Sequence, residues 1–382
     1  MTTPRSATSL GGIVTASRTI GLIFVVLALP ACRQAGREGP AATGSSAPVS
    51  LQEAWQTERD TLDNIDSPAV WHGPDGQHWL LSTAKTTDVL VVNDAATGKE
   101  LRRVGGPGTE LGKLERPNGI AIVDSLALVV ERDNHRVQVF SLPSFESLGV
   151  FGDTLLRKPY GIAVYPAAEQ GAYIAYVTDN YELVEDSVPP DSMLGERVRQ
   201  FRIVVGPERL NAELMATFGD TAGPGVLKVV ESIAADVPNN RLMIAEELET
   251  ASHIKVYSLD GRFTGQVIDS GLFPNQAEGI LLYECGDTAG YWITTDQGME
   301  ANTFHVFDRQ TLDHVGSFRG AQTLNTDGIA LTQRGFGDFP HGAFYALHND
   351  GNVAAFSWGA IADSLKLRKD CGARDGAGEP AS

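Results

Sequence analysis

Acidic side chains recur at one position of a repeated sequence pattern, where they could bind a hard metal ion. Glu231, Glu278 and Asp327 each precede a small residue and a short apolar run. Carboxylate oxygens are the ligands that Ca²⁺ and Mg²⁺ prefer, and a flexible site with many carboxylates favours Ca²⁺. Carboxylates that lie close together also raise one another's pKa unless a cation separates them. If the chain brings these three residues together, they predict a calcium site.

A second set of polar residues follows the next β-rich run of each repeat. Lys85 and Arg132 belong to this set, and their fixed positive charges could hold phosphate oxygens, Arg132 in bidentate fashion. Tyr160 occupies in its own repeat the position that the acids occupy in theirs. The whole second set comprises Lys85, Arg132, Asn180, Glu247, Gln297 and Asn349. A cation site beside fixed bases points to a ligand that carries phosphate.

The pattern that carries these residues occurs six times, at intervals of roughly 50 residues. Its starts are Ser67, Asn118, Tyr160, Glu231, Glu278 and Asp327. Each start opens a β-rich run, turn signals separate it from further runs, and no stretch shows sustained helical periodicity. This period suits propeller blades of about four strands. We therefore predict an all-β fold, a six-bladed β-propeller, with an insertion near residues 182–197 and closure by an extra strand from Trp55 to Leu62.

A propeller places equivalent positions of successive blades around one axis, so both sets of residues should converge at one end of the channel. The convergence would bring four carboxylates close to Lys85, Arg132 and Tyr160. A simpler interpretation is that strand ends are solvated, and that a polar ring there needs no ligand.

The charge balance narrows the choice of partners. The 382 residues include 48 acids and 30 bases, a formal net charge of −18. A chain this acidic is a poor candidate for a nucleic-acid binder, because such binding needs clustered Lys and Arg. An anionic membrane surface would repel it. A phosphate ester would bind only where a metal ion or a few placed bases neutralise its charge, and we expect a monomer.

The first residues are typical of an export signal. Residues 1–31 hold two arginines and a short apolar run, and Leu29-Pro30-Ala31-Cys32 resembles a bacterial lipobox. We expect cleavage before Cys32, lipidation of its thiol, a flexible tether over residues 32–50, the propeller over 51–365 and a tail over 366–382. The protein would then be exported and lipid-anchored to a bacterial membrane, periplasmic or at the cell surface. The alternative is an ordinary signal peptide with an incidental cysteine.

Two further cysteines remain, Cys285 in the propeller and Cys371 in the tail. Disulfides persist in the compartments that exported proteins reach, so a Cys285–Cys371 bridge is plausible. It would join the tail to the propeller. The alternative is two free thiols.

Taken in order, the motifs resemble those of the β-propeller phytases, calcium-dependent phosphatases of inositol hexakisphosphate. Asp66-Ser-Pro-Ala-Val-Trp71 looks like that family's opening Asp-Asp-Pro-Ala-Ile-Trp. Ile244-Ala-Glu-Glu247, Glu278-Gly279, Gln297-Gly298 and Thr326-Asp-Gly-Ile329 match its later motifs. The likeness runs from about Asp66 to Asp363. One stretch, Asn134-His-Arg-Val-Gln-Val-Phe140, is also similar to an NHL propeller repeat.

The resemblance assigns roles to individual residues. It implies that Lys85, Arg132 and Tyr160 contact phosphate, and that calcium is held by Asp66, Glu231, Glu247, Glu278, Asp327 and Gln297. Three residues, in two motifs, depart from the family. Asn180 and Tyr181 replace its Lys-Glu pair, and Gln276 replaces an aspartate. These changes weaken the case for a second phosphate pocket and for a full set of calcium ions.

Two functions follow from these residues. The first is a calcium-dependent phosphomonoester hydrolase that acts on phytate or another phosphate ester, with a metal-activated water as nucleophile. The second is a non-catalytic, NHL-like propeller lipoprotein that binds a protein or a small ligand on the same face. The NHL-like stretch and the changes at Asn180 and Gln276 favour the second.

Overall fold

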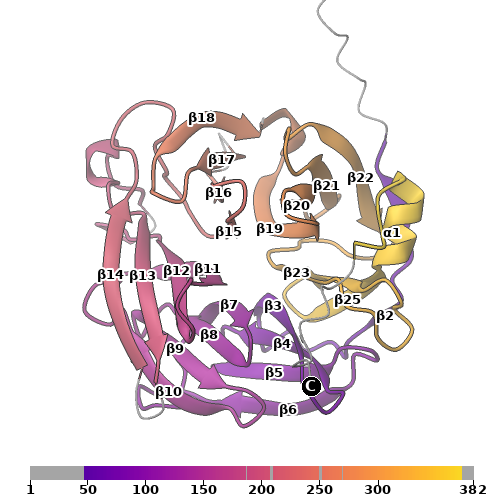
Figure 1. Cartoon of the computed structure of the whole chain (residues 1–382), viewed down its shortest axis with the longest axis horizontal. Helices are drawn as coiled ribbons and strands as arrows, with labels where there is room; N and C mark the ends of the chain where they lie inside the picture. Colours follow the sequence, from indigo (N-terminus) through magenta and orange to yellow (C-terminus); the bar gives the residue numbers. More distant parts are fainter. Residues whose placement is uncertain (1–46, 186, 207–209, 249–251, 269, 372–382) are drawn as a thin grey trace, which may run out of the picture. The chain divides into compact units, whose positions relative to one another are not determined.

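The computed structural model describes residues 47–371, apart from 186, 207–209, 249–251 and 269. The predicted signal, Cys32 and most of the predicted tether lie outside the described residues. The rest forms six small sheets arranged as a six-bladed β-propeller (Figure 1), which confirms the predicted fold. Among the described residues, no helix is long and apolar enough to cross a membrane.

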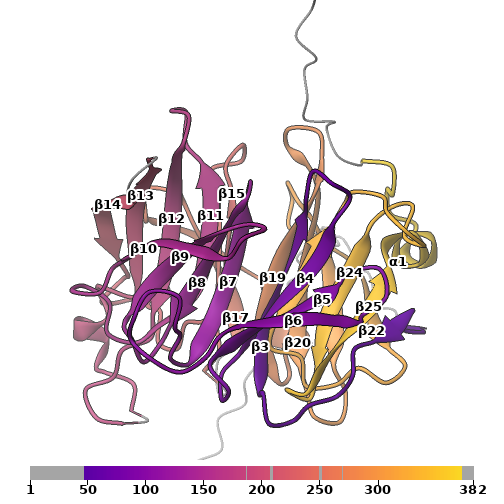
Figure 2. The same cartoon turned by 90° about the horizontal axis from the view of Figure 1, so that it is seen from below.

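Each blade is an antiparallel sheet whose first strand lies next to the central axis. In the side view of Figure 2 these inner strands run from one end of the propeller toward the other. The inner strands are β3 (Ile65–His72), β7 (Pro117–Val123), β11 (Pro159–Pro166), β15 (Ile233–Asp236), β19 (Gln276–Cys285) and β23 (Ile329–Thr332). The second strands are β4 (His78–Ala84), β8 (Leu126–Glu131), β12 (Ala172–Asp179), β16 (Arg241–Glu246), β20 (Ala289–Gln297) and β24 (Ala343–His348).

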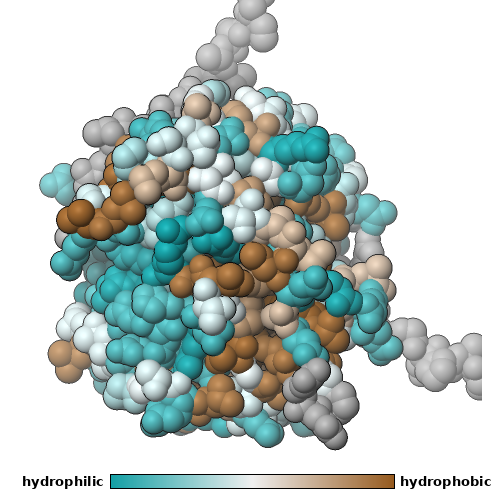
Figure 3. Space-filling model, turned by 90° about the vertical axis from the view of Figure 1, so that its left-hand side faces the viewer, coloured by the Kyte–Doolittle hydropathy of each residue, from teal (hydrophilic) through white to brown (hydrophobic). Residues whose placement is uncertain are grey.

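Two more strands complete each blade toward the outside. The third strands are β5 (Val89–Asp94), β9 (Arg136–Ser141), β13 (Val198–Val205), β17 (His253–Tyr257), β21 (Thr303–Asp308) and β25 (Asn352–Ser357). The outer strands are β6 (Glu100–Gly105), β10 (Glu146–Phe151), β14 (Leu210–Phe218), β18 (Phe263–Ile268), β22 (His314–Gly320) and β2 (Trp55–Gln56). Figure 3 shows the side that carries β13 and β14, where hydrophobic residues form separate patches among hydrophilic ones.

The ring is closed by the N-terminal part of the described chain. Strand β2 pairs with β25 and completes the sixth blade, and β1 (Val49–Leu51) adds to the fifth blade beside β22. The predicted closing strand from Trp55 to Leu62 is therefore too long. After Gln56 the regular pairing ends, although the Thr57 and Asp60 amides still donate to carbonyl oxygens of the sixth blade. The Asp60 side chain then accepts a hydrogen bond from the Leu62 amide in a turn. Strand β1 also begins inside the predicted tether.

The hydrophobic core lies between neighbouring blades. Val130 and Val137 of the second blade, for example, share one buried cluster with Val177 and Phe201 of the third. Similar clusters fill the other spaces between blades. Because each inner strand packs against both neighbours, the ends of these strands are held in fixed positions around the axis.

The long connection between β12 and β13 is the insertion that the sequence predicted. It spans residues 180–197 and includes the 3₁₀ turn η1 (Asp191–Met193). A second such turn, η2 (Ser270–Leu272), precedes β19. The insertion leaves the second strand at the same end of the propeller as the predicted site.

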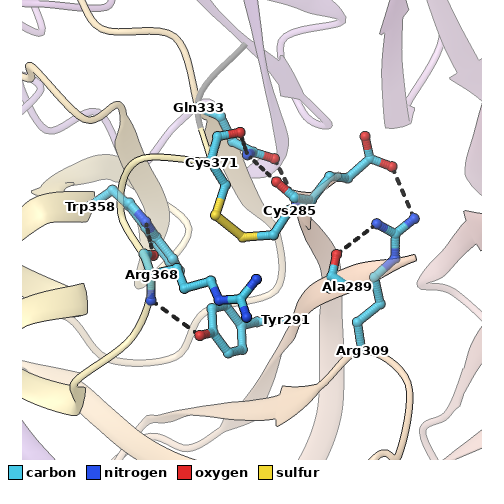
Figure 4. The surroundings of a disulfide bond; sticks show 9 residues. Cys285, Ala289, Tyr291, Arg309, Gln333, Trp358, Arg368 and Cys371 are labelled. Carbon is cyan, nitrogen blue, oxygen red and sulfur yellow. Dashed lines mark hydrogen bonds and ion pairs between the residues drawn. A yellow bond between two sulfur atoms is a disulfide. The ribbon is translucent and has the colours of Figure 1, made fainter. Parts of the chain in front are cut away.

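The tail is attached to the fifth blade. Helix α1 (Trp358–Leu365), which is too short to show a helical period in the sequence, leads to Cys371, and its Sγ is bonded to that of Cys285 (Figure 4). Gln333 donates its side-chain amide to the carbonyl oxygens of Glu284 and Cys371. The residues around the disulfide thus fasten the tail to the end of β19.

Candidate functional site

The starts of the inner strands meet at one end of the central channel and line a cavity of about 340 Å³. Asp66, Tyr160 and Glu278 lie within their inner strands, and Glu231 and Asp327 come two residues before theirs. The pairing register shifts just after these positions in β3, β11 and β19. Such bulges re-aim side chains, and here the side chains at the strand starts line the cavity.

The small residue that follows each residue at the start of an inner strand has a packing role. A Cβ added to Gly161 would collide with the carbonyl oxygen of Glu231 in the next blade, and one on Gly328 would collide with that of Asp66. Thr178 donates its hydroxyl to the same Glu231 carbonyl at 3.0 Å. The repeated Gly-Ile motif therefore allows neighbouring blades to approach closely and fixes the backbone of the ring.

Lys85 joins the first and last blades across the cavity. Its Nζ lies 2.8 Å from Oδ1 of Asp66 and 3.7 Å from Oδ2 of Asp327. The Tyr160 hydroxyl donates to the same oxygen of Asp66 at 3.3 Å, and the Gln297 side-chain amide donates to Asp327. One cation, one hydroxyl and one amide thus gather around two carboxylates.

Three further carboxylates form a tight group beside them. Oxygen atoms of Glu231, Glu247 and Glu278 all lie within 4.8 Å of one another. Glu247 and Glu278 are buried, with exposed fractions of 2% and 5%. Ser232 donates its amide to Glu247 at 3.2 Å and its hydroxyl to Glu278 at 3.4 Å. We call Glu231, Glu247 and Glu278 the carboxylate cluster.

Burial and mutual repulsion change the acidity of these groups. Burial, and then the charge of Asp66, raises the pKa of Glu231 to about 8. Burial and the other members of the cluster raise the pKa of Glu247 and Glu278 well above the ordinary value. Burial and Asp66 likewise raise the pKa of Asp327 to about 7. The raised pKa values indicate that the charge of Lys85 alone does not neutralise the carboxylates. The site therefore favours binding of a proton or of an added cation.

Lys85 and Tyr160 keep their protons in this environment. Burial alone would lower the pKa of Lys85, but the charges of Asp66, Asp327 and Glu231 outweigh it and leave that pKa above its usual value. Burial, followed by the charges of Asp66 and Glu231, raises the pKa of Tyr160 well above 10. At neutral pH the site therefore offers a fixed positive charge and a hydroxyl donor.

The structure does not bring every predicted residue into this cavity. Arg132 lies in a neighbouring cavity instead, and its Nε donates to Asp133 at 2.6 Å. Asn118 is fully buried, and its side-chain amide has no hydrogen-bond partner among the described residues. Asn180 accepts a hydrogen bond from the amide of Val230 at 3.4 Å. Of the residues predicted to follow the second strands, Lys85, Glu247 and Gln297 lie against the acidic side chains of the cavity.

The sequence analysis missed two residues that act on the site. Ser232 holds two members of the carboxylate cluster, although its position was visible as the one serine among glycines in the later repeats. Asp350 interacts electrostatically with Lys85 and Asp66, and burial raises its pKa. The turn signal Asn349-Asp-Gly351 gave no hint of this, because turns of that kind are common.

Residues 226–372 match the Phytase family model. This confirms, for that part of the chain, the resemblance seen in the sequence. The matched range covers the fourth, fifth and sixth blades apart from β1 and β2, and it contains the whole carboxylate cluster, together with Gln297 and Asp327. Asp66, Lys85 and Tyr160, which complete the site, lie outside the range that matches the phytase model.

Two solved structures are distantly similar to this chain. A calcium-binding protein, regucalcin, from Agrobacterium tumefaciens str. C58 is similar over 81% of this chain and 95% of its own, with 12% identity and a TM-score of 0.49. Kuenenia stuttgartiensis hydrazine synthase is similar over 82% of this chain and 85% of its own, with 12% identity and a TM-score of 0.47. No curated protein matches the sequence.

Proposed function

We propose that this protein is a calcium-dependent, phytase-like hydrolase of phosphate monoesters. One observation carries the proposal. A cluster of three carboxylates lies beside a protonated lysine and a tyrosine hydroxyl, in a propeller whose last three blades match the Phytase family.

The residues present fit a calcium ion. Two oxygens bound to one Ca²⁺ lie at most about 5 Å apart, because each bond is roughly 2.3–2.6 Å long. The ligand oxygens of Glu231, Glu247 and Glu278 meet this condition, and the raised pKa values show that their charges need compensation. Asp66, Asp327 and Gln297 could add oxygen ligands from across the cavity. When bound, a calcium ion neutralises phosphate charge and lowers the pKa of a coordinated water.

The chain's own residues bind and orient the phosphate. The Lys85 ammonium donates to a phosphoryl oxygen, and its ion pair with Asp66 weakens as it does so. Tyr160, protonated because its pKa is raised, donates its hydroxyl to the same group. Both donors stabilise the charge that builds up on the transferring phosphoryl group.

The reaction is a simple hydrolysis. The oxygen of a water molecule bonds to phosphorus, and the bond from phosphorus to the leaving oxygen breaks. The leaving oxygen takes the bonding electron pair, and the proton that the water loses ends on it overall. The products are inorganic phosphate and an alcohol, and the reaction needs no covalent enzyme intermediate.

The test is phosphate release from phytate and from a simple monoester, with added calcium and with a chelator. The proposal expects release only when calcium is present. The second candidate, a non-catalytic binding module, is favoured by Arg132, whose side chain pairs with Asp133 rather than facing the ring. Calcium binding without any release of phosphate would favour that candidate.

We also propose that the protein works outside the cytoplasm, lipidated at Cys32 and attached to a bacterial membrane only through that anchor, as a monomer. The lipobox-like Leu29-Pro-Ala-Cys32 supports the anchor, and the Cys285–Cys371 disulfide suits an oxidising compartment. Metabolic labelling with a radioactive fatty acid tests it, with a Cys32→Ser variant as the control. Equal labelling of both proteins would refute the anchor.

A further inference from the structure

A second cavity of about 280 Å³ lies next to the site, on the same end of the propeller. It is formed where the second and third blades present the ends of β8 and β12 and the start of the insertion. Lys158 lines this side cavity, and Tyr160, two residues later, lines the central one. Three bases line the side cavity together with three acids and His135, and its uncharged lining residues are Tyr181, Leu183 and Val184.

The bases of the side cavity are already paired with acids. Arg132 Nε lies 2.6 Å from Asp133, and Lys158 forms an ion pair with Glu182. Arg157 forms an ion pair with Glu196, which Arg199 also contacts at 3.0 Å. With each positive charge balanced by a neighbouring carboxylate, the cavity offers little attraction to a second phosphate group.

Besides these ion pairs, His135 and Glu185, the cavity is lined by two aliphatic side chains and one aromatic ring. Leu183 and Val184 have exposed fractions of 54% and 69%. Tyr181 is buried, and the Arg157 guanidinium lies 3.6 Å from the centroid of its ring. A planar guanidinium stacked on one aromatic ring can stack on another with its outer side. The exposed aliphatic side chains are then available to cover the edge of such a ring.

We propose that the side cavity binds the apolar, preferably aromatic, organic group of a phosphate monoester whose phosphate lies in the central cavity. This inference rests on the proposed function and names its substrate class. It makes Leu183, Val184 and Arg157 specificity-determining residues. The substrate would be an aryl phosphate rather than an ester with many phosphate groups such as phytate, because the three bases and three acids that line the side cavity leave it formally neutral.

The test compares phenylphosphonate with methylphosphonate, two unreactive ligands that differ only in the organic group. Their affinities are measured by calorimetry in the presence of calcium. The parent protein should bind phenylphosphonate about tenfold more tightly, as expected for one apolar group in a pocket. A Leu183→Ser/Val184→Ser variant should lose most of that preference. A Leu62→Ser variant, which changes another exposed aliphatic side chain that lies outside the cavity, should keep it.

Hydrolysis of phenyl phosphate and of glycerol phosphate provides the second readout. A higher kcat/KM for phenyl phosphate that falls in the double variant would support the inference. Equal affinities for the two phosphonates, or a preference that survives the double substitution, would overturn it while leaving the hydrolase function standing. Failure to bind either phosphonate, with no release from any ester, would overturn the proposed function itself.

Discussion

The ammonium of Lys85 lies 2.8 Å from the carboxylate of Asp66, and both belong to the first blade, at the point where it meets the sixth. The same ammonium lies 3.7 Å from Asp327 of that sixth blade. One ion-pair network therefore spans the closure of the propeller and forms one wall of the cavity. A change in the charge of the site therefore also affects the contact between the first and sixth blades.

Removal of Lys85 should reduce turnover more than removal of Arg132. Lys85→Ala deletes a charge that faces the central cavity, and loss of one such donor lowers the rate by about 10²–10³-fold. Arg132→Ala should cost less, because this side chain pairs with Asp133 in the side cavity. Steady-state kinetics on a phosphate monoester, with melts on the same samples, measures both effects. A larger loss for Arg132→Ala would show that Arg132 turns toward the phosphate when substrate binds.

Calcium-free protein should lose stability as the pH rises from 6.5 to 8. Burial and Asp66 raise the pKa of Glu231 from 4.5 to about 8 and that of Asp327 from 3.8 to about 7. The folded protein therefore binds more protons than the unfolded chain in this window, and raising the pH removes that stabilisation. Urea titrations across the window, with and without calcium, test this, since bound calcium should flatten the dependence. A calcium-free protein whose unfolding free energy is constant or rises would contradict the buried carboxylate cluster.

Below pH 6.5 two buried histidines change the stability in the opposite direction. Burial lowers the pKa of His72 and of His305 to about 4. Between pH 6.5 and 4 the unfolded chain binds more protons at these residues than the folded protein does. Their contribution to stability therefore decreases as the pH is lowered. The calcium-bound protein should therefore lose stability as the pH falls from 6.5 to 4, which urea titrations in this window would measure.

The buried ion pair between Arg309 and Asp236 should be essential for stability. Both side chains are fully buried, and Arg309 donates to the two carboxylate oxygens at 2.7 and 2.9 Å, joining the fifth blade to the fourth. Asp236→Asn should destabilise the protein by about 3 kcal/mol, because it leaves the buried Arg309 charge with only the exposed Glu284 as an ionic partner among the described residues. The exposed Arg262–Asp260 pair is the matched control, and Asp260→Asn should cost no more than about 1 kcal/mol. Equal small effects in chemical denaturation would refute this role.

The Cys285–Cys371 disulfide should stabilise the folded protein by roughly 4 kcal/mol, since it closes a long loop. Thiol titration of unfolded, non-reduced protein should find neither cysteine free. Reduction should lower the melting temperature of the parent but leave a Cys285→Ala/Cys371→Ala variant unchanged. A parent whose melting temperature is insensitive to reductant would show that the tail is held by its hydrogen bonds alone.

The blades and much of the site could be predicted because a propeller repeats one local pattern. The small residue before each Ile reflects a close contact between neighbouring blades, so the motif marks the start of an inner strand. Residues at that start, such as Glu231 and Glu278, line one cavity as a consequence of the symmetry. The position of Lys85 followed from the same argument applied to the second strand.

Other features depend on contacts that no repeat encodes. Arg132 holds an equivalent position to Lys85, but the neighbouring Asp133 pairs with it and keeps it in the side cavity. The closing strand is shorter than expected because pairing partners and a local turn at Asp60 decide where it ends. Ser232 was recognisable only as a departure from glycine, and its two hydrogen bonds arise from the fold.

The central claim is that a calcium ion in the carboxylate cluster is required for phosphate release. The most direct measurement is the rate of release from a phosphate monoester as a function of free calcium, for the parent and for Glu278→Gln, which removes one charge from the cluster. The account predicts a saturable rise in rate for the parent. It also predicts a higher half-saturating calcium concentration for the variant, with activity partly restored at high calcium. A rate that does not change with a chelator, or with the Glu278→Gln substitution, would contradict it.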